Sequence, residues 1–221
     1  MASRRLFVPG LSHHVRHRGN NGTHVFRDDD DREQYLALFA ESASKYEVDV
    51  YCYCLMTTHT HAVVEAHEPD ALPRMMQSLG RSYVRYFNHR HHRSGTLWEG
   101  RYRAGLIATD YHWLNCLRYV EMNPVAARMV SSPEAYRWSS YRAHANGDGN
   151  ALLAPHPLFM QLAPDPASRG ARWASICNEP LSEVDLAEIR TATRRGLRLG
   201  GSNGSFEGDQ LSLNRYSEPA L

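Results

Sequence analysis

The chain has 221 residues, of which 42% are hydrophobic and 22% charged, and its formal net charge at pH 7 is +1. These values are ordinary for a soluble globular protein of one domain, or of one domain with an appendage. No apolar run approaches the roughly 18 residues of a membrane-spanning helix. The first apolar run stops at Pro9-Gly10, which is too short for a secretory signal, so the expected compartment is the cytoplasm.

Nearly all the positive charge is arginine, because Lys45 is the only lysine. Arginine suits bidentate phosphate contacts better than lysine does. The base composition of the genome explains the same bias equally well. The four cysteines lack metal-ligand spacing, and Cys52 and Cys54 alternate on one expected strand, which favours buried thiols over a disulfide.

Local patterns predict strands and helices in a simple order along the chain. The expected elements are a strand at 6–18, a helix from Asp28 to about Lys45, strands at 48–56 and 59–66, a helix at about 70–90, a strand at 104–108, a helix from about Tyr111 and a helix at 182–195. The first six follow the split βαβ order, which predicts an α+β, ferredoxin-like fold. We expect a four-stranded antiparallel sheet with helices on one face, followed by a helical and irregular C-terminal extension.

Composition divides the chain into three parts. Residues 1–145 form the expected main domain, and 146–180, which begin with an Asn-Gly-Asp-Gly-Asn run, read as a linker and irregular arm. Residues 181–221 contain the last helix and a Gly/Ser-rich tail that we expect to be disordered from Gly200.

Two short segments set local expectations. The acidic run Asp28–Asp31 stands at a helix start, where carboxylates satisfy free amides and favour the dipole, so capping explains it better than metal binding. Thr57-Thr58 joins two strands but is poor two-residue turn chemistry, which predicts a longer loop.

Residues 81–103 carry six arginines against one acidic residue, Glu99, with aromatic residues interleaved. Such a segment is a candidate track for nucleic acid, although a solvated helix face plus a loop explains the same pattern. The polar strand before Gly19 is either a solvated surface or a contact for anions. The DNA-binding candidates are Arg16, Arg18, Arg81, Arg85, Trp98, Arg101 and Arg103.

His59 and His61 are two residues apart on an expected strand, so their side chains share a face and could close on one ion. Tyr119 and Asn123 lie one turn apart on a later helix. Phosphodiester cleavage needs a nucleophile, an ion that polarises the phosphate and a place for the leaving oxygen. We therefore predict a metal on His59, His61 and Asn123, with Tyr119 attacking to leave a covalent phosphotyrosine. A packed aromatic side chain is the competing interpretation of Tyr119.

The chain resembles the REP-associated tyrosine transposases, a branch of the single-tyrosine HUH transposases. The similarity rests on six blocks in family order across about 8–141. They are Val8–Val15 with Arg18–Asn20, Val25-Phe26, Tyr53–Met56 with His59 and His61, Gly95–Tyr102, Arg118–Ala127, and Trp138–Tyr141.

The resemblance implies a nuclease acting on single-stranded DNA folded into palindromic, REP-like hairpins. It assigns a divalent ion, Mg²⁺ or Mn²⁺, to His59 and His61 with help from Asn123, and assigns the attack to Tyr119, which leaves a 5′-phosphotyrosine and a free 3′-hydroxyl. The segment 189–196 is similar to a family C-terminal region that contacts DNA.

The chain departs from the family pattern at Thr57-Thr58, where Pro-Asn is usual, at Thr60, where an aliphatic residue is usual, and after Leu199, where the usual final helix is lost.

Two imidazoles suit Mn²⁺ or Zn²⁺ better than Mg²⁺, which prefers oxygen ligands.

Two other functions fit the sequence. One is a domesticated protein that holds hairpin DNA without cutting it, and the other is a metal phosphodiesterase that uses water as the nucleophile. The sequence does not distinguish a monomer from a homodimer.

Overall fold

The computed structural model describes residues 7–200. The strands are β1 (Ser12–Arg18), β2 (Val48–Met56), β3 (His59–Ala66), β4 (Arg103–Ile107) and β5 (Arg198–Leu199), and the helices are α1 (Asp29–Lys45), α2 (Ala71–Arg90), α3 (Asp110–Ala126), α4 (Tyr141–Asn146), α5 (Pro157–Met160), α6 (Pro166–Asn178) and α7 (Glu183–Arg195). Short 3-10 turns occur at Asn20–Gly22 and Pro133–Ala135. The predicted disordered tail, 201–221, lies outside the described residues.

The sheet has the order β2-β3-β1-β4-β5, with β1 between β3 and β4 and antiparallel to both. The β2 strand pairs antiparallel with β3, and β5 pairs parallel with β4. The α+β, ferredoxin-like prediction is confirmed, with five strands in place of the four expected. The extra strand has only two residues, which is too short for a periodic signal in the sequence.

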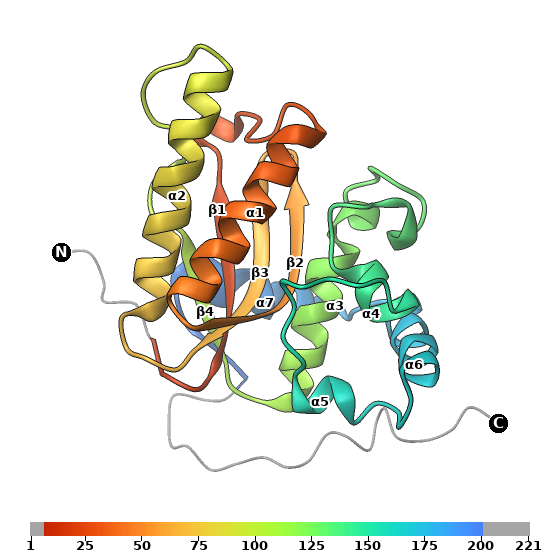
Figure 1. Ribbon diagram of the computed structural model, residues 1–221. Helices are drawn as coiled ribbons and strands as arrows, with labels where there is room; N and C mark the ends of the chain where they lie inside the picture. Colours follow the sequence, from red (N-terminus) through yellow and green to blue (C-terminus); the bar gives the residue numbers. More distant parts are fainter. Residues whose placement is uncertain (1–6, 201–221) are drawn as a thin grey trace.

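Helices cover both faces of the sheet, whereas the sequence predicted them on one. On one face the hydroxyl groups of Tyr35 in α1 and Thr60 in β3 lie 3.4 Å apart. On the other face the indole of Trp113 in α3 donates a 3.1 Å hydrogen bond to the hydroxyl of Ser12 in β1. Figure 1 shows α1 and α2 side by side in front of the sheet and α7 behind it. The periodicity of a helix shows that one side is buried, but not which face of the sheet it buries.

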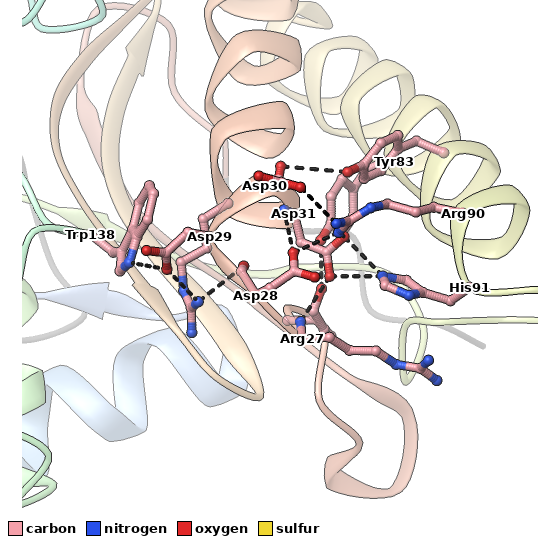
Figure 2. A network of polar contacts seen from close by, with 12 residues as sticks. Arg27, Asp28, Asp29, Asp30, Asp31, Tyr83, Arg90, His91 and Trp138 are labelled. Carbon is pink, nitrogen blue, oxygen red and sulfur yellow. Dashed lines mark hydrogen bonds and ion pairs between the residues drawn. The ribbon is translucent and has the colours of Figure 1, made fainter.

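The acidic run at the start of α1 caps the helix, as predicted, and it also connects α1 to α2, which was not predicted. The Asp28 carboxylate accepts from the backbone amide of Asp31, and the fully buried Asp31 accepts from the backbone amide of Arg27. Arg90 and His91, at the end of α2, donate to the same carboxylates (Figure 2). The network connects the start of α1 to the end of α2. It also occupies the guanidinium group of Arg90 with carboxylates of this chain.

The connection between β2 and β3 is the two-residue Thr57-Thr58 turn, so the expectation of a longer loop was wrong. Its carbonyl groups are held by neighbouring backbone, because the amide of Val25 donates to Thr57 and the amide of Gly19 donates to Thr58. These tertiary hydrogen bonds supply the stability that the turn sequence lacks. His59 therefore lies directly at the tip of the hairpin.

The segment 146–180 is not the irregular linker that its composition predicted. It contains α5 and α6, and α6 packs against α4 and α3. Trp173 of α6 is fully buried and its indole donates to the Glu121 carboxylate of α3 at 2.8 Å. Residues 141–178 therefore belong to the folded body.

The last predicted helix is confirmed, with Ser182 as its N-cap accepting from the amide of Asp185. It packs along β4 and β1. None of the helices in residues 7–200 is long and apolar enough to cross a membrane.

Candidate active site

His59 and His61 point to the α3 side of the sheet, and their ring centroids lie 5.0 Å apart at an interplanar angle of 78°. They share this face because side chains alternate along a strand, so residues two positions apart point to the same side. His61 is 2% exposed, whereas His59 at the hairpin tip is half-buried. Two imidazoles at this separation can present nitrogen atoms to one ion.

Each ring has one nitrogen engaged and the other open. The Nδ1 atom of His59 lies 3.0 Å from the Thr58 hydroxyl, and the Nδ1 atom of His61 lies 2.8 Å from Nε2 of His14. Among residues 7–200 neither Nε2 atom has a hydrogen-bond partner. The two Nε2 atoms are therefore available as ligands.

Burial keeps these rings neutral. It lowers the pKa of His59 to about 4, assisted by the charges of Arg16 and Arg18, and it lowers the pKa of His61 well below 6.5. The pKa of His14 falls to about 3, chiefly by burial and then by Arg16. Metal ions bind the neutral imidazole, so at neutral pH no proton has to leave before a metal binds.

Tyr119 of α3 lies over this group. Its ring centroid is 5.7 Å from that of His61 and 5.6 Å from that of His14, both edge-on. Thr109 caps the start of α3, and Tyr119 stands half-buried between the buried Arg118 and Val120. The helix thus places the phenol next to the rings of His61 and His14.

Asn123 follows one turn later and is half-buried. Its amide group donates to the Tyr119 carbonyl at 2.7 Å, and within the described chain Oδ1 has no hydrogen-bond partner. In residues 7–200 no three His, Cys, Asp or Glu side chains are grouped to hold a metal. A further protein ligand would therefore be of another type, and the amide oxygen of Asn123 is a group of such a type. Such a nitrogen-rich set suits a borderline ion such as Mn²⁺ better than Mg²⁺.

The profile of the family described as "Transposase IS200 like" matches residues 7–123, which is more than half of the chain. The chain belongs to this family. The match ends at Asn123, so it contains β1 to β4 and most of α3 but none of the later helices.

Two solved structures are similar to the chain, and the first of them supports the fold. A REP-associated tyrosine transposase, solved bound to a REP hairpin, is similar with a TM-score of 0.54 and 16% identity, over 71% of this chain and 92% of that one. A Deinococcus radiodurans R1 protein, whose description assigns it provisionally to the transposases, has a TM-score of 0.37 and 19% identity, over 47% of this chain and 84% of that one. A comparison of the chain with curated proteins found no match.

Three of the arginines singled out in the sequence of this transposase lie on the histidine face. Arg16 pairs across the sheet with His61 on one side and with Arg103 on the other, and Arg18 follows two residues later. Arg16 is half-buried, its pKa is lowered by burial and by Arg18, and it is near enough to Tyr119 for their charges to interact. Arg16, Arg18 and Arg103 form a positive rim on the histidine face, in which Arg18 is also ion-paired with Glu99 at 3.7 Å.

The other DNA-binding candidates are separated from this rim or enclosed. Arg81 and Arg85 are exposed on α2, which covers the opposite face of the sheet. Trp98 is 7% exposed and stacks on His17 at 3.9 Å, so it is a core residue in this structure and offers no free face to a base. Arg101 is exposed in the loop before β4, two residues from Arg103.

Sequence reasoning missed the contacts of His14 with His61 and with Thr193. His14 has the same strand parity as Arg16, a signal that places it on the face of His59 and His61 once the pairing of β1 with β3 is known. Thr193 lies in the segment expected to contact DNA, but it is buried against His14 at 2.6 Å. No local pattern in the sequence reveals that contact.

Proposed function

We propose that this transposase cuts and rejoins single-stranded DNA folded into palindromic hairpins, with Tyr119 as the nucleophile and a divalent metal held by His59, His61 and Asn123. The observation that carries the proposal is the position of the Tyr119 ring, 5.7 Å from the ring of His61, whose Nε2 is open. Membership of the transposase family supports DNA as the substrate.

The reaction is a transesterification. The Tyr119 oxygen bonds to phosphorus, the bond from phosphorus to the 3′-oxygen breaks, the phenolic proton passes to solvent, and the departing 3′-oxygen gains a proton. The products are a 5′-phosphotyrosine and a free 3′-hydroxyl, and reversal with another 3′-hydroxyl rejoins a strand. No energy source is needed, because one phosphodiester replaces another.

A metal bound by these residues would withdraw charge from the phosphate. The chain itself supplies the rest of the electrostatics. Arg16, Arg18 and Arg103 lie on the same face of the sheet as the histidine pair, where their positive charge would attract a phosphodiester, and guanidinium groups suit its paired oxygens. The half-buried Arg16 is near enough to Tyr119 for the phenol to raise the pKa of the guanidinium against the lowering by burial.

The experiment uses the full chain, Mn²⁺ and hairpin DNA with single-stranded flanks, labelled at either end. We expect a denaturation-resistant adduct that carries the 3′-end label, whereas the 5′-end label leaves on a free fragment. Tyr119→Phe should give no adduct. Tyr86→Phe, which removes a phenol from α2 on the other face, is the matched control and should behave as wild type.

Each other outcome selects another function. A 5′-end label in the adduct would reverse the proposed polarity. Cleavage without an adduct, unchanged in Tyr119→Phe, would show a water-using phosphodiesterase. Binding without cleavage under Mn²⁺ and Mg²⁺ would show a hairpin-binding protein.

A further inference from the structure

We propose that a chain of hydrogen bonds from α7 through Thr193 and His14 fixes the tautomer and orientation of His61, so that its Nε2 lone pair faces the ion. The inference deepens the proposed function and rests on His61 as a ligand. It makes His14 and Thr193 positioning residues, and it gives α7 a part in the metal site although α7 lies outside the family match.

The contacts run without a break. Thr193 Oγ1 lies 2.9 Å from the Ile189 carbonyl oxygen and 2.6 Å from Nδ1 of His14. Nε2 of His14 lies 2.8 Å from Nδ1 of His61, with the two rings nearly parallel at 17°. His14, His61 and Thr193 are all buried, so water does not compete for these hydrogen bonds.

The contact with Ile189 favours one direction for the hydrogens. A carbonyl oxygen can only accept, so when the hydroxyl of Thr193 donates to Ile189, Nδ1 of His14 is left to donate to Thr193. Nε2 of neutral His14 is then the acceptor for Nδ1–H of His61. That leaves the lone pair of His61 on Nε2, which is the open nitrogen. The reverse direction would place a hydrogen on Nε2 of His61, and the two directions therefore predict opposite tautomers of His61. Outer hydrogen bonds of this kind set ring orientation and ligand basicity in metal sites.

A close approach of backbone to backbone brings Thr193 within reach. Gly105 of β4 pairs with His14 across the sheet, and a Cβ on Gly105 would lie 2.9 Å from the carbonyl carbon of Ala192 and from the amide nitrogen of Thr193. Only a residue without a side chain permits α7 to lie this near the sheet. Gly105 of β4 therefore allows the close approach of α7, and it lies opposite His14, the residue that Thr193 of α7 contacts.

The two ligands are supported differently. Nδ1 of His59 contacts only the hydroxyl of its sequence neighbour, Thr58, whereas His61 is held through two further residues from other elements. We infer that the long-range support matters for His61, because its ring is the one buried between β1 and α3.

Thr193→Val tests the proposal, because valine keeps the shape of threonine and removes the hydroxyl. We expect Mn²⁺ affinity of the purified full chain, measured by titration without DNA, to fall about ten- to hundred-fold. Thr193→Ser should restore it. Thr191→Val on the same helix is the matched control and should bind as wild type. His14→Gln, which retains an acceptor, should bind more tightly than His14→Leu.

Nitrogen-15 NMR of the imidazoles in the metal-free protein gives an independent readout. In the wild type, His61 should show protonated Nδ1 and unprotonated Nε2, and Thr193→Val should mix the two tautomers. A folded Thr193→Val variant with unchanged affinity and an unchanged His61 tautomer would overturn the relay. If the wild type and Thr193→Val show the expected spectra but the wild type binds no Mn²⁺, the proposed metal function fails and the hydrogen-bond relay stands.

Discussion

The indole Nε1 of Trp173 donates a 2.8 Å hydrogen bond to Oε2 of Glu121, a carboxylate that is 0% exposed. The other oxygen of Glu121 accepts from the Ser140 hydroxyl and from Nδ1 of His144 at 2.7 Å. Three donors thus meet one carboxylate of α3: one from Ser140, the residue before α4, one from α4 and one from α6. A buried carboxylate is stable only when its oxygens are satisfied in this way.

Trp173→Phe should therefore destabilise the protein although it keeps an aromatic side chain. Leaving one oxygen of a buried carboxylate without its donor costs about 1–3 kcal/mol. Chemical denaturation of Trp173→Phe, Glu121→Gln and the double variant should give a coupling energy clearly different from zero. Strict additivity of the two changes would show that α6 is not held by this contact.

Local chemistry made the elements predictable. Asp28 and Thr109 accept from the amides three residues later and so mark helix starts, and the alternation of 48–56 and 59–66 is a property of neighbouring residues. His59 with His61, and Tyr119 with Asn123, could each be recognised as a pair because the strand and helix repeats bring near neighbours together, whereas the roles assigned to these residues stay predictions. The predictions of helices and strands held where the relevant contacts are close in sequence.

The parts that could not be predicted depend on distant contacts. The hydrogen bond between His14 and Thr193 joins residues 179 positions apart, and the Glu121 network joins α3 to residues up to 52 positions away. The Pro- and Gly-rich composition around α6 suggested an irregular arm, yet buried Trp173 anchors it. Trp98 was misjudged because its position beside arginines gave no sign of its stacking on His17.

Gly105→Ala should weaken both stability and metal binding. The added methyl group meets backbone atoms of α7 at 2.9 Å, which cannot move as a side-chain end does. Overpacking of this kind costs typically about 1–3 kcal/mol, and the shift of α7 should pull Thr193 from His14. Thermal denaturation and Mn²⁺ titration measure the two effects. Gly149→Ala, where a Cβ meets nothing within 4 Å, is the control and should leave both unchanged.

Stability should fall below neutral pH in part through His156. This ring stacks on Trp113 at 3.9 Å, and burial lowers its pKa to about 4. Between pH 6.5 and 4 the unfolded chain binds the proton and the folded chain does not, so stability is full above pH 6.5 and declines as the pH falls toward 4. The lowered pKa values of His14, His59 and His61 act in the same direction.

His156→Phe isolates this contribution, because the aromatic stack on Trp113 can remain while the titrating group is removed. The free energy of unfolding of the variant, measured from pH 7.5 to 4.5, should depend less on pH than that of the wild type. The variant also loses the acceptor for the Leu158 amide, so the slope with pH, rather than the stability at one pH, is the quantity to compare. Parallel curves for the two proteins would contradict the assignment.

Arg16→Ala should weaken binding of single-stranded DNA and slow formation of the Tyr119 adduct. Arg16 lies on the histidine face and is near enough to Tyr119 for their charges to interact, so its loss removes a positive charge beside the proposed nucleophile. If one phosphate contact is lost, the slope of log affinity against log salt should fall by about 0.7 for a single strand. Arg81→Ala removes an equal charge from the exposed side of α2, on the other face, and serves as the control. Equal effects of the two changes on affinity and adduct rate would mean that the DNA follows α2 rather than the rim formed by Arg16, Arg18 and Arg103.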